Sequence, residues 1–209
     1  MKALPKKLLP LILSGIAVTS LFSIRAAQGF TVTLEQVGSN VVATGSGAIN
    51  LTGLTFASGG LVANGSMGPS IALLVVADGT GLSQYTGFSG PSSFGPGITI
   101  INASSCSGDS VGIVGPAFFL GASIFLPAGY VSGTALSDSS TYNSATFASL
   151  GVTPGTYVWT WGTGLPNQNF TLQIGSLGVP PPVNDGGSTV SLLGFALLGL
   201  AAFRRKLSC

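Results

Sequence analysis

The sequence predicts an all-β fold: a single β-sandwich-like domain between an N-terminal signal peptide and a C-terminal hydrophobic helix. Three observations support this prediction. Short runs of β-branched and aromatic residues alternate with turns of Gly, Pro, Asn and Ser. No long stretch keeps the 3.6-residue apolar period of a capped helix. The composition is also unusual, because 32 of the 209 residues are glycine and only 6% are charged, against about 25% in a typical soluble domain.

The first 29 residues have the three parts of a secretory signal peptide. Three lysines fall within the first seven residues, and the apolar run Leu8–Phe22 follows them. Ala27 and Gly29 then place small residues at the −3 and −1 positions of a cleavage site. We therefore expect residues 1–29 to be removed during export, so that the exported chain begins at Phe30.

Residues 30–178 form the predicted all-β domain. Turn residues divide it into strand-like runs, which are Phe30–Val37, Asn40–Thr44, Ala48–Phe56, Ile71–Val76, Ile98–Asn102, Val111–Phe119, Tyr157–Gly162 and Phe170–Ile174. One short helical turn is expected at Ser144–Leu150. Many short strands favour a sandwich. A β-solenoid ranks second, because the region has no clean repeat period.

The charge pattern excludes several classes of function. The sequence has no histidine, and no Lys or Arg lies between Arg25 and Arg204. A domain without cations cannot neutralise phosphates, which excludes nucleic acid as a partner. A Ser-His-Asp triad, a Cys-His pair, a Ser-Lys dyad and histidine-based zinc sites are excluded as well. We therefore expect no enzyme, no cofactor and no metal.

Four carboxylates remain in the domain, on Glu35, Asp78, Asp109 and Asp138. The three aspartates lie in Gly- and Ser-rich segments that are typical of turns, although they could also gather around Ca²⁺. A glycoside hydrolase would require two facing carboxylates within about 10 Å. Hydrolysis by these aspartates is therefore the third hypothesis. Cys106 has no histidine or lysine to activate its thiol, and we interpret it as unreactive.

One strand-like run has a regular aromatic pattern. In the segment GTYVWTWG, Tyr157, Trp159 and Trp161 alternate with smaller residues, so that the three rings share one face of a strand. We favour a hydrophobic core stripe, because aromatic residues dominate core burial. The alternative is an exposed aromatic platform for sugar rings, which would make the protein a carbohydrate-binding module.

The C-terminal segment begins with a proline-rich spacer at 179–183, which favours an extended, stiff conformation. Residues 184–209 contain the apolar run Thr189–Phe203, which is shorter than the ~20 residues of a typical membrane-spanning helix. The run stops at Arg204, Arg205 and Lys206, which the positive-inside rule keeps in the cytoplasm. We predict a transmembrane helix that serves as a temporary anchor, since short disposable tails are typical of segments that are cut off.

The residues before this apolar run form a recognisable motif, made of Val183, Asp185, Gly186, Gly187, Ser188 and Thr189. Together with the apolar run and the basic end, this motif resembles the bacterial PEP-CTERM sorting signals, in the variant with a V-P-D-S-G type sequence. Asn184 stands where that motif has proline. The resemblance implies cleavage by an exosortase-like enzyme. The stretch from Leu126 to Gly164 also resembles exported proteins with such tails, a resemblance that implies a destination and no chemistry.

The sequence therefore predicts an exported structural or interaction protein. It would be held transiently in the inner membrane and then passed to the cell envelope or the extracellular matrix. An exosortase-like enzyme is the expected processing partner, and exopolysaccharide is a candidate partner in the matrix. A nearly uncharged surface suits this role, because low charge reduces repulsion between copies.

Overall fold

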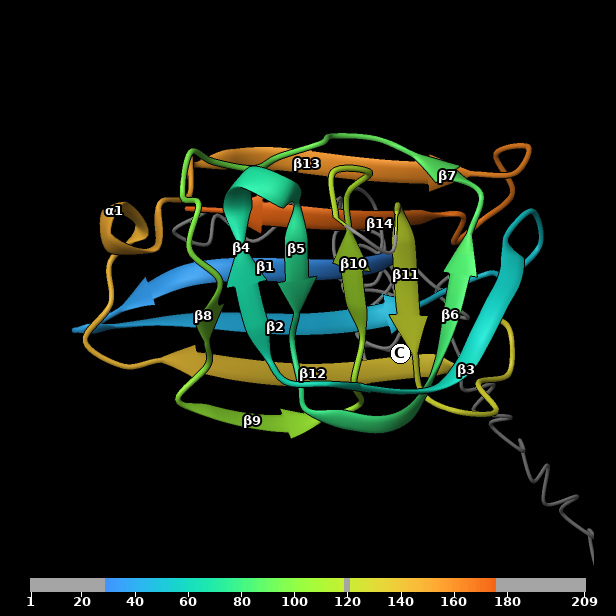
Figure 1. Ribbon diagram of the computed structural model, residues 1–209, viewed down its shortest axis with the longest axis horizontal. Helices are drawn as coiled ribbons and strands as arrows, with labels where there is room; N and C mark the ends of the chain where they lie inside the picture. Colours follow the sequence, from blue (N-terminus) through green and yellow to red (C-terminus); the bar gives the residue numbers. More distant parts are fainter. Residues whose placement is uncertain (1–28, 119–120, 176–209) are drawn as a thin grey trace, which may run out of the picture.

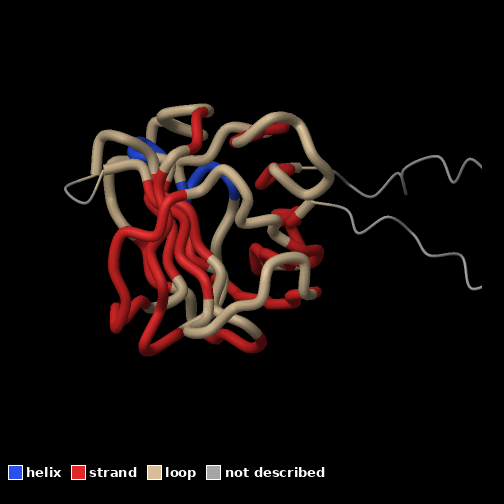
Figure 2. The backbone as a smooth tube through the Cα atoms, turned by 90° about the vertical axis from the view of Figure 1, so that its right-hand side faces the viewer, coloured by secondary structure: helices blue, strands red, loops and turns tan. Residues whose placement is uncertain are grey.

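The computed structural model describes residues 29–118 and 121–175, which form two seven-stranded sheets packed face to face (Figure 1). The strands of one sheet run across those of the other. In Figure 2, one layer of strands runs up the picture while the other is seen nearly end-on. This crosswise arrangement is that of orthogonal sheet packing. The prediction of an all-β sandwich is confirmed for these residues. The predicted signal peptide up to residue 28, the proline-rich spacer and the C-terminal helix lie outside them.

The first sheet contains both the first and the last strand of the domain. Its order is β7 (Phe88–Ser89), β13 (Gly155–Trp161), β14 (Asn169–Ile174), β1 (Phe30–Val37), β2 (Asn40–Ala48), β12 (Ala135–Tyr142) and β9 (Ser105–Gly108). Only β1 and β14 pair in parallel. Buried residues alternate along β1, at Phe30, Val32 and Leu34, and along β14, at Phe170, Leu172 and Ile174. This period of two is expected for strands with one face on the core.

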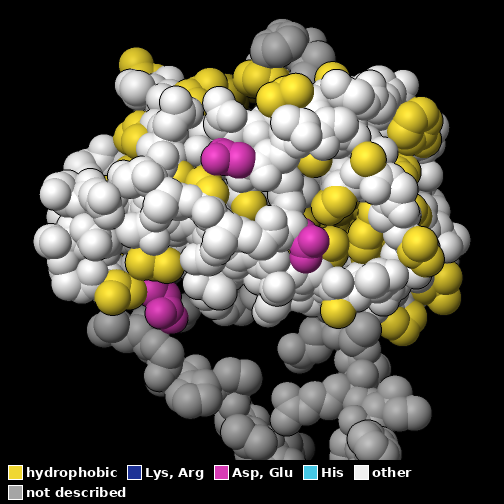
Figure 3. Space-filling view, turned by 90° about the horizontal axis from the view of Figure 1, so that it is seen from below, with side chains coloured by type: hydrophobic (Ala, Val, Ile, Leu, Met, Phe, Trp, Pro, Cys, Tyr) yellow, Lys and Arg dark blue, Asp and Glu magenta, His cyan; other side chains and the backbone are white. Residues whose placement is uncertain are grey.

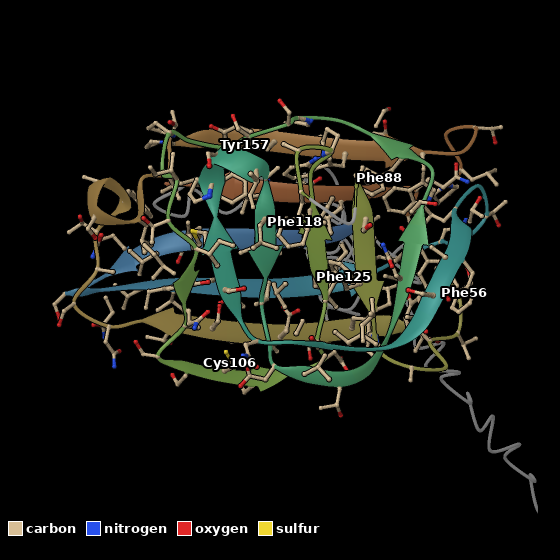
Figure 4. The ribbon with its side chains drawn as sticks, viewed as in Figure 1. Phe56, Phe88, Cys106, Phe118, Phe125 and Tyr157 are labelled. Atoms are coloured by element: carbon tan, nitrogen blue, oxygen red, sulfur yellow. The ribbon has the colours of Figure 1, made fainter. Side chains whose placement is uncertain are left out.

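The second sheet is antiparallel throughout. Its order is β3 (Thr55–Ala63), β6 (Gly79–Thr86), β11 (Ser123–Leu126), β10 (Gly112–Val114), β5 (Leu73–Val75), β4 (Ser66–Gly68) and β8 (Ile101–Asn102). Every residue of β5, β10 and β11 is buried. Their inner side chains join the main core, and their outer ones form a second cluster with partly buried Leu61 and Phe118. Figure 4 shows Phe118 and Phe125 on this outer side.

Two short helical turns interrupt the strands, η1 (Pro69–Ile71) and α1 (Phe147–Leu150). α1 confirms the predicted helical turn, in a shorter form. It begins with a capping box, in which the Ser149 amide donates to Thr146 Oγ1 (3.1 Å) and the Thr146 amide donates to Ser149 Oγ (2.8 Å). It ends at Gly151, whose φ of 67° is the left-handed conformation that favours glycine.

Several predicted strands differ from the structure. The run Ala48–Phe56 is not one strand, because β2 ends at Ala48 and β3 begins at Thr55. The predicted strand at 111–119 is reduced to the three residues of β10. Conversely, the polar segment ALSDSSTY forms β12, which pairs with β2 along its whole length. Pairing with a well-defined neighbour therefore outweighs the weak β-propensity of Ser and Asp.

Candidate functional site

An open cleft lies at the end of the first sheet where β7, β13 and β14 meet. Its volume is about 910 Å³, within the usual range of ligand sites. Phe88 and Leu165 supply apolar surface, and Leu165 is 48% exposed. The rest of the lining is uncharged and comes from Gly29, Gly87, Ser89, Thr160, Trp161, Gly162, Gly164, Pro166, Asn167, Gln168 and Asn169. A cleft of this composition suits a neutral, hydroxyl-rich ligand better than a charged one.

The loop between β13 and β14 is held in place by Gln168. Its Oε1 accepts hydrogen bonds from the amides of Thr163 (3.0 Å) and Leu165 (2.7 Å), and its Nε2 donates to the Thr52 carbonyl (2.6 Å). The two neighbouring asparagines differ, because the Oδ1 atoms of Asn167 and Asn169 are buried without a hydrogen-bond partner. A buried acceptor without a donor is costly, so both oxygens are candidates for binding a donor group.

The aromatic residues of β13 face the core. Trp159 is 1% exposed and Trp161 is 5% exposed. Their Nε1 atoms donate to the main-chain carbonyls of Pro91 (2.9 Å) and Asn50 (2.7 Å). The Trp159 ring also packs edge-on against Phe170, with centroids 5.8 Å apart. Tyr157 is partly buried, and its ring packs edge-on against Phe94 at a centroid distance of 6.1 Å.

The alternative interpretation of β13, as an exposed aromatic platform for sugar rings, is therefore wrong, because both tryptophans are buried. Both tryptophans belong to the core, as the favoured interpretation expected, and the segment after β7 lies across Trp159. A Cβ placed on Gly90 would lie 2.5 Å from Cδ1 of Trp159, which shows how closely this segment covers the ring. Rings that are buried in this way cannot stack on a sugar.

Asp138 points from β12 into the core, where it is 5% exposed and neither carboxyl oxygen has a hydrogen-bond partner. It lies opposite Gly45 of β2, and a Cβ on Gly45 would overlap the Asp138 carboxyl. Burial raises the pKa of Asp138 to about 8, the charge of Asp109 adds to this, and the amides of Gly45 and Val111 oppose it without reaching hydrogen-bond geometry. The carboxyl is therefore protonated at neutral pH.

The other two aspartates of the domain each accept a hydrogen bond from a main-chain amide. Asp109 accepts a hydrogen bond from the Ser137 amide (2.9 Å), while Asp78 accepts one from the Gly65 amide (2.7 Å). Cys106 lies beside Asp78, and burial, together with that carboxylate, raises the pKa of its thiol. The structure thus brings Asp109 near Asp138 and Asp78 near Cys106. In residues 29–118 and 121–175, no group of three or more such side chains could hold a metal ion.

The cleft and the aspartates lie at opposite margins of the first sheet. Phe88 belongs to edge strand β7 and Cys106 to edge strand β9, and Figure 4 shows them far apart. None of the aspartates lines the cleft. In the view of Figure 3, the acidic side chains stand apart from one another among uncharged ones. The cleft therefore has no pair of carboxylates of the kind that glycoside hydrolysis requires, and of the aspartates only Asp109 lies near the buried Asp138.

Sequence reasoning missed the cleft residues Asn167, Gln168 and Asn169. The segment LPNQNF contains three consecutive amide side chains, which is a signal for a hydrogen-bonding loop. Nothing in the pattern indicated that Gly29 and Phe88 would meet this loop, because they are distant in sequence and are brought there by strand pairing.

Comparisons with known proteins identify the C-terminal segment. Residues 182–207 match the model of the VPDSG-CTERM motif. This confirms the resemblance to PEP-CTERM-like sorting tails, and the motif implies an exported protein with a transient membrane anchor that is sorted by an exosortase-like system. No curated protein and no solved structure matches the chain with significant similarity. Within the described residues, no helix is long and apolar enough to cross a membrane.

Proposed function

We propose that this protein is a structural or interaction component of the cell surface or extracellular matrix and that it has no enzymatic activity. The observation that carries the proposal is the sorting motif at residues 182–207. An exosortase-like enzyme cuts the tail near Val183–Ser188 and releases the β-domain from the inner membrane. The uncharged cleft, which none of the aspartates lines, supports a role in binding rather than in catalysis.

The processing step predicts two different masses for the protein. Protein purified from its host should lack the segment after about Ser188, while protein from a strain without the exosortase should keep it. Replacing Arg204, Arg205 and Lys206 by glutamine should reduce the cleaved fraction, because the basic stop that orients the tail is lost. Intact mass spectrometry measures all three forms. A complete tail in the normal host would contradict the proposal.

The matrix partner that we propose is a neutral exopolysaccharide bound in the cleft. The domain has no basic side chains with which to bind an anionic polymer, whereas Phe88 and the amides beside it offer stacking and hydrogen-bonding surface. Trp159 of β13 does not line the cleft, and Trp161, which does, is only 5% exposed.

Phe88→Ala should reduce the amount of protein that sediments with the host exopolysaccharide by about tenfold, the effect of one lost aromatic contact in a binding site. Phe56→Ala is the matched control, because Phe56 is 59% exposed on β3 and does not line the cleft. Urea unfolding of both variants checks that the fold is kept. Equal sedimentation of the two variants would argue against the cleft as the binding site.

A further inference from the structure

A buried acceptor lies where the signal peptide is expected to be cut. Asn169 Oδ1 is buried without a hydrogen-bond partner. A Cβ placed on Gly29 would overlap this oxygen and would lie 3.0 Å from the main-chain oxygen of Asn169. Two acceptors of one residue therefore flank the backbone at Gly29. The peptide bond that joins Gly29 to Phe30 is the bond expected to be cleaved.

The parallel pairing of β1 with β14 brings the Phe30 nitrogen to the same place. Phe30 lies opposite Phe170, and Leu34 lies opposite Ile174. The Gly175 amide donates to the Leu34 carbonyl (3.0 Å), which shows that Leu34 directs its main-chain polar groups toward β14. Alternate residues of a strand do the same, so the nitrogen of Phe30 faces the main-chain carbonyl of Asn169.

Cleavage changes the chemistry of this nitrogen. In the uncut chain, Phe30 has a single amide N–H, which serves the main-chain oxygen of Asn169. Hydrolysis of the Gly29–Phe30 bond leaves an α-ammonium group with three donors, and hydrogen bonds from a charged donor are stronger than neutral ones. One N–H of the ammonium group keeps the hydrogen bond to the main-chain oxygen of Asn169, and a second is available for Asn169 Oδ1. The cut also removes Gly29, which contacts that oxygen.

We propose that Asn169 binds the new α-ammonium group of Phe30, so that removal of the signal peptide completes the hydrogen bonding at this end of β1. The inference rests on the export proposed above. No cationic side chain of the domain competes for the site, because the sequence has no Lys or Arg between Arg25 and Arg204. The ligand of this site is thus the protein's own amino terminus, which reaches the site only after processing.

The amino terminus can be measured by selective acylation. The sequence has no lysine between Lys7 and Lys206, so a chain cut at both ends has one amine. Exported protein from the host is treated at neutral pH with sulfo-NHS-acetate, and the labelled fraction is followed by intact mass and peptide mapping. We expect the folded protein to react about tenfold more slowly than the same protein in urea, the effect of a one-unit rise in the pKa of the amine.

Two substitutions in the full chain test the role of Asn169. Asn169→Ala should bring the labelling rate of the folded protein close to the rate in urea. Asn169→Asp keeps an acceptor, adds a charge and should slow labelling further, which decides the question even where the alanine variant does not fold. Asn64→Ala is the matched control, since Asn64 is exposed near the second sheet and does not line the cleft.

The inference is overturned by an exported chain that begins at a residue other than Phe30. It is also overturned by equal labelling of folded and unfolded protein, or by an Asn169→Asp variant that labels as fast as wild type. The intact mass measured in the same experiment also shows whether the C-terminal tail has been removed. Loss of the tail with rapid labelling would overturn only this inference, whereas a retained tail would contradict the proposed function.

Discussion

Asp138→Asn is expected to remove most of the loss of stability that the protein undergoes as the pH rises from about 4 to about 8. Asparagine has the same shape as the protonated aspartic acid but cannot ionise. At pH 8 and above, the variant should be more stable than wild type by about 5 kcal/mol, because the pKa rises from 3.8 to about 8 and each unit corresponds to about 1.4 kcal/mol. Near pH 4 the two proteins should have similar stability.

The sign follows from the two pKa values of Asp138. Its pKa is about 8 in the folded protein, against an ordinary value of 3.8. Between these values the unfolded chain has released a proton that the folded chain retains. The free energy of unfolding therefore falls as the pH rises, by about 1.4 kcal/mol per pH unit. This stabilisation is complete below pH 3.8 and is lost through pH 8.

Urea unfolding of the exported protein at a series of pH values measures this effect. Glu35→Gln is the matched control, because it removes a carboxylate from β1 and leaves Asp138 in place, so the slope should persist. A wild-type stability that is constant between pH 5 and 8, or an Asp138→Asn variant with the wild-type slope, would contradict a buried, protonated Asp138.

Trp159→Ala should destabilise the domain by about 3–5 kcal/mol, the usual cost of truncating a large buried aromatic residue. The indole ring is 1% exposed, packs on Phe170 and donates a hydrogen bond to Pro91. Its removal leaves a cavity between β13 and the segment after β7. The midpoint of urea unfolding measures the loss.

The neighbouring tyrosine provides the control for this prediction. Tyr157→Phe removes only the hydroxyl that donates to the Thr153 carbonyl (3.0 Å) at an exposed position. It should therefore cost about 1 kcal/mol or less. Were Trp159→Ala to keep wild-type stability while losing sugar binding, the ring would act as a binding platform, and its place in the core would be contradicted.

The all-β class of the domain and the sorting of the protein for export could both be predicted from the sequence. The alternation of apolar and polar residues in Phe30–Val37 depends only on neighbours in the chain, and the predicted bounds of this strand are those of β1. The sorting motif is also local, since an enzyme reads it as a short extended segment. In both cases the information lies in consecutive residues.

The tertiary structure alone decided which polar residues are buried and which residues share the cleft. Nothing local marks Asp138 as a core residue, because its burial results from pairing of β12 with β2 and from the space that Gly45 leaves. The cleft likewise joins Gly29, Phe88 and Asn169 through strand pairings. Burial and proximity depend on contacts between distant segments, and periodicity along the chain carries no information on which segments will meet.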